Sequence, residues 1–231
     1  MSDKTPLRPV TRPRLYEQVV EQILDWVRDN DLRVGDRLPP ERELAQRLGV
    51  SRATVSQALV AMEVVGVVAV RHGDGATLVE SAGVSKVVGA LRRHAQQLPE
   101  VIEAREALES KLAALAAVRR TDADLERIDH ALDLMERDID AGGRGVEGDE
   151  LFHAAVTAAG HSALLAQLMN EISDLILETR IESLSQPDRP RESLEGHRRI
   201  AEAIRAGDPE AAAQAMRDHV DKVSDVALLR D

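Results

Sequence analysis

One stretch of the chain, residues 36–59, constrains its fold more than any other. It reads DRLPPERELAQRLGVSRATVSQAL. Gly49 supplies the permissive backbone that ends a first helix, and Ser51 offers a hydroxyl group to cap a second one. The small residue Ala45, the turn at Gly49 and the apolar Val55 have the spacing of two helices that cross at a tight turn. This stretch therefore predicts a helix-turn-helix.

The second predicted helix has an apolar face and a polar face. Its apolar side chains recur at helical spacing, which predicts a buried face. They are Val55, Ala58, Leu59 and Met62. The opposite face carries small or hydrogen-bonding groups suited to base edges and phosphates in a DNA major groove. They are Arg52, Ala53, Ser56 and Gln57. An ordinary helical hairpin with a solvated outer face has the same pattern.

The residues that follow favour DNA binding over an ordinary hairpin. Residues 67–71 form a short β-branched apolar run, 72–75 have turn chemistry, and 77–79 can return as a strand. A β-hairpin directly after the second helix is a wing. Apolar residues also recur at helical intervals over about 14–29, which predicts a first helix. Together these elements predict a winged helix-turn-helix.

The charge of the chain is divided unevenly along its length. The formal net charge is −11. The first 80 residues nevertheless hold almost as many basic as acidic side chains, and the acidic excess lies in the remainder. Six arginines cluster around the predicted helix-turn-helix: Arg33, Arg37, Arg42, Arg47, Arg52 and Arg71. Local charge placement governs DNA affinity, so the acidic total does not exclude DNA binding.

Composition excludes several other classes of protein. The chain has no cysteine, so disulfide and thiolate chemistry are absent. No apolar run is long enough to span a bilayer, and the N-terminus lacks the apolar region of a signal peptide. We therefore expect a soluble cytoplasmic protein with no membrane partner. With one Trp, one Tyr and one Phe, recognition of single strands by base stacking is disfavoured.

From about residue 84 onward the sequence has only helical signals, with breaks marked by Gly and Pro. Helices are expected near 84–96, 99–120, 122–141, 146–159, 162–184, 191–206 and 209–229. The fold class is therefore mainly α. The predicted parts are a winged helix-turn-helix at 12–80, a linker and first helix at 81–98, and an all-α bundle at 99–225.

Four polar side chains interrupt the apolar stripes of the predicted bundle: Asp149, His153, His197 and His219. Burying a carboxylate and three imidazoles is costly unless they are paired, and one metal ion can pair all four. Three neutral histidines and a carboxylate suit Zn²⁺, Ni²⁺ or Mn²⁺ better than Ca²⁺. A single histidine on an apolar face is more often a core residue, and spacing alone does not show that the four converge.

Three further polar residues lie in the predicted helices. Arg105 shares an apolar stripe with leucines of its helix, so its guanidinium is expected to point inward. It can form an ion pair with Glu109 one turn on, or bind the carboxylate of an effector with its planar fork. His94 and His130 lie among charged residues and are expected at the solvated surface.

Residues 12–80 resemble the DNA-binding domain of the GntR family of bacterial transcription regulators. The segment LPPERELAQRLGVSRATV at 38–55 carries most of the resemblance. It implies DNA contacts from the second helix, from the start of the third and from the wing, at Arg42, Ser51, Arg52, Thr54, His72 and Gly73. Three departures prevent transfer of an operator sequence. Ser56 replaces a long basic residue, the wing reads Gly75-Ala76-Thr77-Leu78 where the family usually has Gly-Thr-aromatic-Val, and Asp74 puts a negative charge on the wing tip.

Residues 99–225 resemble the FCD ligand-binding domain of the FadR subfamily. The motifs are DELFH at 149–153, EGHRRIAEAIRAGDPEAA at 195–212 and AMRDHV at 215–220. In metal-containing members an Asp and three His at these positions hold the ion, and all four residues match here. The resemblance also implies a small carboxylate effector at open metal positions, with Arg105 nearby.

The sequence thus predicts a homodimeric, effector-responsive transcription regulator that binds a palindromic double-stranded operator. In similar proteins the effector more often releases the DNA, so we expect a repressor. Two alternatives remain. A metal-dependent hydrolase or lyase could be fused to the DNA-binding head, with Glu150 or Glu178 as the only candidates for a general base. An architectural DNA binder could use the bundle for dimerisation alone, with a purely structural polar cluster.

Overall fold

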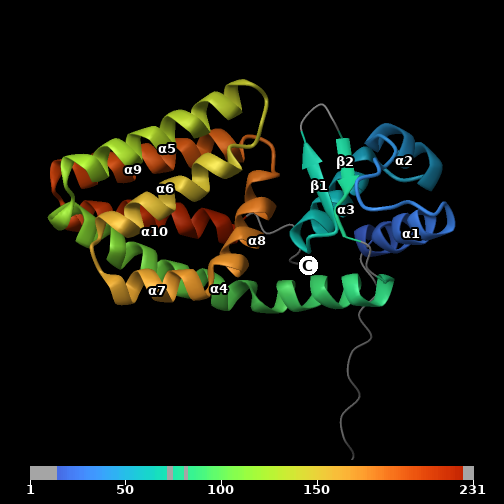
Figure 1. Cartoon of the computed structure of the whole chain (residues 1–231), viewed down its shortest axis with the longest axis horizontal. Coiled ribbons are helices and arrows are strands. Elements are labelled where there is room, and N and C mark those ends of the chain that lie inside the picture. Colours follow the sequence, from blue (N-terminus) through green and yellow to red (C-terminus); the bar gives the residue numbers. More distant parts are fainter. Residues whose placement is uncertain (1–14, 72–74, 81–82, 226–231) are drawn as a thin grey trace, which may run out of the picture.

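The computed structural model describes residues 15–71, 75–80 and 83–225. Over these ranges the chain is mainly helical, with three short helices and a hairpin at one end and a bundle of longer helices at the other (Figure 1). None of the described helices is both long and apolar enough to cross a membrane. The predicted fold class, a winged helix-turn-helix followed by an all-α bundle, is confirmed.

The N-terminal part of the described chain, residues 15–80, is called the head and has the predicted helix-turn-helix and wing. Its elements are α1 (Leu15–Asp29), α2 (Glu41–Leu48), α3 (Arg52–Val64), β1 (Val68–Arg71) and β2 (Gly75–Leu78). Gly49 ends α2 with a φ of 67°, a left-handed conformation that glycine adopts without strain. The hydroxyl of Ser51 accepts a hydrogen bond from the Thr54 N–H at 3.1 Å and so caps α3. Val55, Ala58 and Met62 are fully buried, as expected.

The wing is a two-stranded antiparallel sheet in which Val68 pairs with Leu78 and Arg71 with Gly75. The returning strand begins two residues earlier than predicted, because Gly75 and Ala76 already pair with Arg71 and Val70 of β1. The segment before α2 adds a bridge between Arg37 and Thr77 on the other side of this strand. The Leu38 N–H donates to the Ala76 carbonyl at 2.9 Å. The wing tip, with the predicted contact residues His72 and Gly73, lies outside the described residues.

The bundle follows the wing. Its helices are α4 (Val84–Arg119), α5 (Asp122–Asp140), α6 (Val146–Ala159), α7 (Ala163–Glu171), α8 (Ser173–Leu184), α9 (Arg189–Ala206) and α10 (Pro209–Asp225). Two sets of predicted boundaries were wrong. A single helix, α4, replaces the two expected at 84–96 and 99–120, and two helices, α7 and α8, replace the one expected at 162–184.

Tertiary packing explains the first of these corrections. Pro99 lies inside α4 although an interior proline costs about 3 kcal/mol. Its neighbours Leu98 and Val101 are buried, so continuing the helix keeps both in the core. Between α7 and α8 no Gly or Pro signals a break. Ile172 nevertheless leaves the helical conformation, with φ −110° and ψ 9°, and α8 then turns toward the head (Figure 1).

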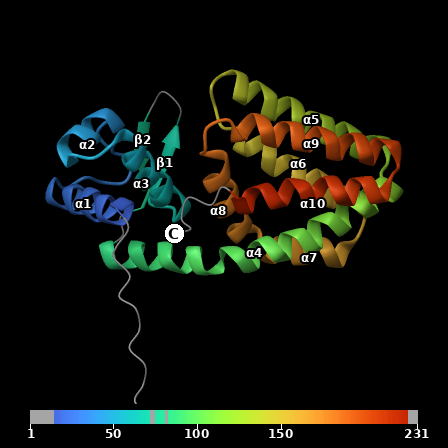
Figure 2. The ribbon, with the colours of Figure 1, turned by 180° about the vertical axis from the view of Figure 1, so that it is seen from behind.

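Two helices connect the head with the bundle. The long α4 runs beneath both parts, and α8 lies between them in both views (Figures 1 and 2). Val87 and Leu91 of α4 belong to the apolar core of the head, and Ile181 of α8 packs against the same core. A separate apolar core fills the bundle and includes Phe152, Ile200 and further side chains of α4, α5, α6, α9 and α10.

Candidate metal centre and DNA-binding surface

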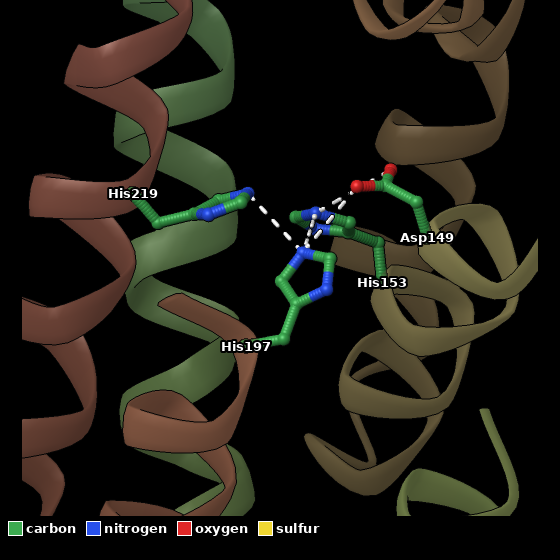
Figure 3. Close-up of side chains that lie close together, drawn as sticks. All are labelled: Asp149, His153, His197 and His219. Carbon is green, nitrogen blue, oxygen red and sulfur yellow. Dashed lines mark hydrogen bonds and ion pairs between the residues drawn. The ribbon is translucent and has the colours of Figure 1, made fainter. Parts of the chain in front are cut away.

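The four side chains predicted as metal ligands meet inside the bundle (Figure 3). Asp149 and His153 lie one turn apart on α6, His197 lies on α9 and His219 on α10. None is more than 4 % exposed. Each offers a possible ligand atom within 4.8 Å of the others. The Nε2 atom of His197 lies 3.2 Å from that of His153 and 3.3 Å from that of His219.

The chemistry of this cluster fits a divalent metal ion. Burial lowers the pKa of His197 to about 3, although the charge of Asp149 opposes the shift. Burial, together with His197 and His153, also holds the pKa of His219 well below its usual value. Neutral imidazoles present lone pairs, and three nitrogen atoms with one carboxylate are a donor set for a borderline ion. The cluster is therefore compatible with a metal site.

Surrounding groups hold two of the imidazoles in place. The Glu109 carboxylate lies 2.5 Å from Nδ1 of His153. In the tautomer that carries its proton on Nδ1, the Nε2 atom is free to face the centre. Phe152 stacks on His197, with ring centroids 4.1 Å apart. A Cβ atom at Gly196 would lie only 2.8 Å from Nδ1 of His219. Glycine at this position therefore allows α9 and the His219 ring to approach closely.

Two buried arginines border the cluster. Nε of Arg105 lies 2.7 Å from Glu109, the ion pair that the sequence suggested, and Nη1 donates to the Thr179 hydroxyl at 3.0 Å. The second arginine, Arg180 of α8, was missed: its Nε atom lies 2.9 Å from Oδ2 of Asp149. Its four-residue spacing from the buried Ile176 could have indicated an inward position.

The predicted surface position of His94 was wrong. This residue of α4 is 5 % exposed and lies between two carboxylates of α8. Its Nδ1 is 2.7 Å from Glu178 and its Nε2 is 2.8 Å from Glu182. Burial alone would lower the His94 pKa, but the hydrogen bonds and charges of the two glutamates raise it to about 9. His130 is exposed, as expected.

The predicted DNA-contacting residues of the helix-turn-helix lie at or near the surface. Arg42 of α2, Ser51 and Arg52 at the start of α3 are exposed. Thr54, Ser56 and Gln57 on α3 are partly exposed. The hydroxyl groups of Ser51 and Thr54 lie 2.8 Å apart, so these two side chains also take part in the helix cap. The start of α3 thus presents short polar groups and one arginine to solvent.

Comparison with known proteins agrees with both parts of this description. Residues 15–78 match the model of the bacterial regulatory proteins of the gntR family, and residues 100–222 match the FCD domain. The HTH-type transcriptional regulator LutR of Bacillus subtilis is 36 % identical over 87 % of this chain and 95 % of its own. The Uxu operon transcriptional regulator of Escherichia coli is 31 % identical over 91 % and 85 % of the two chains.

A putative L-lactate dehydrogenase operon regulatory protein of Escherichia coli is 30 % identical over 90 % of this chain and 84 % of its own. The solved structure of Escherichia coli McbR/YncC shares the fold, with a TM-score of 0.51, 21 % identity and coverage of 94 % and 98 %. The family and the curated relatives are DNA-binding transcription regulators, which excludes the hydrolase or lyase interpretation. The chain belongs to the GntR family of bacterial transcription regulators and carries a C-terminal FCD domain.

Proposed function

We propose that this protein is a homodimeric, cytoplasmic repressor of the FadR subfamily that a small carboxylic acid releases from a palindromic operator. The acid binds at a divalent metal ion held by Asp149, His153, His197 and His219. The observation that carries this proposal is the meeting of four buried ligand groups in a chain that also has a winged helix-turn-helix. Zn²⁺, Ni²⁺ and Mn²⁺ suit the donor set.

Arg105 is the residue that we assign to the effector carboxylate. Its guanidinium is fully buried beside the cluster, and its contacts with Glu109 and Thr179 engage two of its five N–H donors. A planar guanidinium can bind a carboxylate with two parallel hydrogen bonds. One relative is named for an L-lactate dehydrogenase operon, so L-lactate is the first acid to test.

In the head, α3 is the proposed recognition helix. Arg52, Ser56 and Gln57 lie on its outer face and can reach base edges in the major groove. Arg42, Ser51 and Thr54 are assigned to the neighbouring phosphates, together with His72 and Gly73 of the wing tip. We expect Arg52→Ala to weaken binding to the specific site about 10- to 100-fold, the usual effect of losing a base contact.

An exposed apolar surface supports the proposed dimer. Leu164 of α7 is 68 % exposed, Leu168 of the same helix is 43 % exposed, and Val118 of α4 is 65 % exposed. A second copy packed on α4 and α7 would cover these side chains and give the two-fold symmetry that a palindrome requires. Leu164→Glu with Leu168→Glu should convert the dimer to a monomer in analytical ultracentrifugation, whereas Glu171→Gln should leave it intact.

The proposal is tested by capturing genomic fragments with the purified protein and sequencing them, with and without a chelator. We expect a palindrome that recurs beside a few operons, and the genes of those operons should indicate the effector. Capture by the Arg52→Ala variant is the matched control, and it should lose the palindrome. Fragments without a shared motif would contradict specific recognition and favour an architectural DNA binder.

A further inference from the structure

The helix α8 contacts the candidate metal centre and the DNA-binding head through neighbouring residues. Arg180 forms its ion pair with the ligand Asp149, whereas Ile181, the next residue, packs against the apolar core of the head. Figures 1 and 2 show α8 between the bundle and the head from opposite sides. A shift of α8 at the metal centre would therefore change the packing of Ile181 against the head.

A single arginine joins the end of α8 to the head by polar contacts. Arg144, in the loop between α5 and α6, binds both carboxylate oxygens of Glu63 on α3, each at 2.8 Å. Its Nη1 also donates to the Ser185 hydroxyl after α8 at 2.6 Å, and its Nη2 donates to the Val70 carbonyl at 3.4 Å. Arg144 thus holds α3, β1 and α8 together.

Glu63 extends this contact within the head. Its Oε1 accepts a hydrogen bond from the Val70 N–H at 3.0 Å, so one carboxylate ties the recognition helix to the first strand of the wing. The side chain of Glu63 is 11 % exposed and that of Arg144 is 25 % exposed. A bidentate, partly shielded pair fixes orientation more strictly than an exposed surface pair.

The loop that carries Arg144 is also close to the metal centre along the chain. Asp149 lies in the first turn of α6, five residues after Arg144. The Gly145 N–H donates to the Asp138 carboxylate at 2.7 Å, and a Cβ at Gly148 would lie 2.5 Å from backbone atoms of Met135. The start of α6 is therefore packed tightly against α5. Because this segment cannot deform freely, a displacement of Asp149 should also displace Arg144.

A cleft lies beside this contact. It has a volume of about 900 Å³ and lies between the wing and the corner of α5 and α6. Val70 and Arg71 line one side, and Arg137, Arg144 and Glu147 line the other. In the described part of the chain, Arg144 is the side chain that both lines this cleft and bonds across it to the head.

We propose that Arg144 is a positioning residue that sets the orientation of α3 and the wing and transmits the state of the metal centre to them. This inference rests on the proposed function for the presence of the metal. Its structural basis, the contacts of Arg144 with Glu63, Val70 and Ser185, is independent of any effector.

The test uses the full chain, Zn²⁺ as the probe, and two readouts. The first is amide hydrogen exchange of residues 56–71, measured with Zn²⁺ and with a chelator. The second is affinity for the captured operator under the same two conditions. The variants are Arg144→Ala, Arg144→Lys, and Glu63→Gln, which keeps an acceptor for the Val70 N–H. Arg191→Ala removes an exposed ion pair with Asp140 in the same bundle and is the matched control.

In the wild-type protein we expect Zn²⁺ to slow exchange at Val70 and to change operator affinity within the range of about 5- to 150-fold that is common for coupled sites. In Arg144→Ala and Glu63→Gln the two conditions should differ less than about twofold, with Zn²⁺ affinity unchanged. Arg144→Lys should recover part of the response, because it keeps the charge but loses the bidentate geometry.

Each other outcome counts against the inference. A wild-type head whose exchange ignores bound Zn²⁺, or an Arg144→Ala variant with the full response, would overturn it while the proposed function stands. A protein that binds none of Zn²⁺, Ni²⁺ and Mn²⁺, or that fails to select an operator, would instead overturn the proposed function. In that case unaltered exchange at Val70 in metal-free Arg144→Ala would also remove the positioning role.

Discussion

Buried histidines occupy two places in the same bundle, His94 alone and His197 within the metal-ligand group, and their surroundings shift the two pKa values in opposite directions. His94 lies between Glu178 and Glu182, and its pKa is raised to about 9. His197 lies among other imidazoles and beside one carboxylate, and burial lowers its pKa to about 3. Burial favours the neutral imidazole in both places. Two glutamates within hydrogen-bond distance keep His94 charged, whereas the carboxylate of Asp149 lies 3.5 Å from Nε2 of His197 and does not offset the burial of that ring.

The two groups also limit stability at opposite ends of the pH scale. A raised pKa means that the contribution of His94 is complete below its ordinary value of 6.5 and is lost as pH rises toward 9. A lowered pKa means that the contribution of neutral His197 is complete above 6.5 and is lost as pH falls toward 3. The metal-free protein should therefore be most stable near neutral pH.

The largest effect is expected from removing two members of the metal-ligand group. His197→Ala combined with His219→Ala should lower Zn²⁺ affinity by more than about 100-fold, because even residues that only orient ligands cost 10- to 100-fold. Isothermal titration calorimetry measures this, with the exposed His130→Ala as the control. Binding by the double variant with wild-type affinity would show that these histidines are core residues and not ligands.

The next largest effect concerns Glu109, the buried carboxylate that contacts Arg105 and His153 beside this group. Glu109→Gln leaves the fully buried Arg105 without its ion-pair partner, and breaking one partner of a buried pair costs about 3–5 kcal/mol. Urea unfolding of the metal-free protein would measure the loss. The exposed Glu103 of the same helix provides the control, Glu103→Gln, and equal losses in both variants would refute the buried pair.

The contrast between the two histidine groups is sharpened by a pH titration of His94. Between pH 6.5 and 9 the free energy of unfolding of the wild-type protein should fall by about 3 kcal/mol, the equivalent of the raised pKa. His94→Gln should remove this dependence, whereas His130→Gln should keep it. A wild-type protein with constant stability over this range would mean that His94 is not held as a cation.

The smallest effect tests how closely the metal-ligand group is packed. Gly196→Ala introduces a Cβ atom 2.8 Å from Nδ1 of His219, so the ring must shift. We expect Zn²⁺ affinity to fall about tenfold, the lower end of the range for groups that orient a ligand. Gly89→Ala on α4 is the control, since its Cβ would meet only Arg93 at 3.5 Å. An unchanged affinity in Gly196→Ala would mean that His219 tolerates the shift.

The head was predictable because its signals are local. The cap at Ser51, the turn at Gly49 and the wing glycine at 75 act within a few residues of themselves. The inward position of Asp149 was likewise predictable, because periodicity along one helix decides which face is buried. The meeting of side chains from α6, α9 and α10 was supplied by a family resemblance and not by spacing.

The errors and omissions arose where distant segments decide the outcome. His94 was misplaced because its two glutamates lie more than 80 residues away on α8. Arg144 was not singled out, since an arginine in a Gly-rich loop is ordinarily solvated and its partner Glu63 lies on another part of the fold. Pro99 predicted a break that tertiary packing overrode. Long-range pairing of this kind leaves no periodic trace in one sequence.

Control of DNA binding through the metal centre is tested most directly by titrating the Zn²⁺-loaded protein with L-lactate and other small carboxylic acids. The quantity measured is its affinity for the captured operator. We expect one of these acids to weaken operator binding. A chelator, or the His197→Ala, His219→Ala double variant, should abolish the response while the dimer stays folded. An identical response in the metal-free protein, or in the double variant, would contradict control of the head through this metal centre.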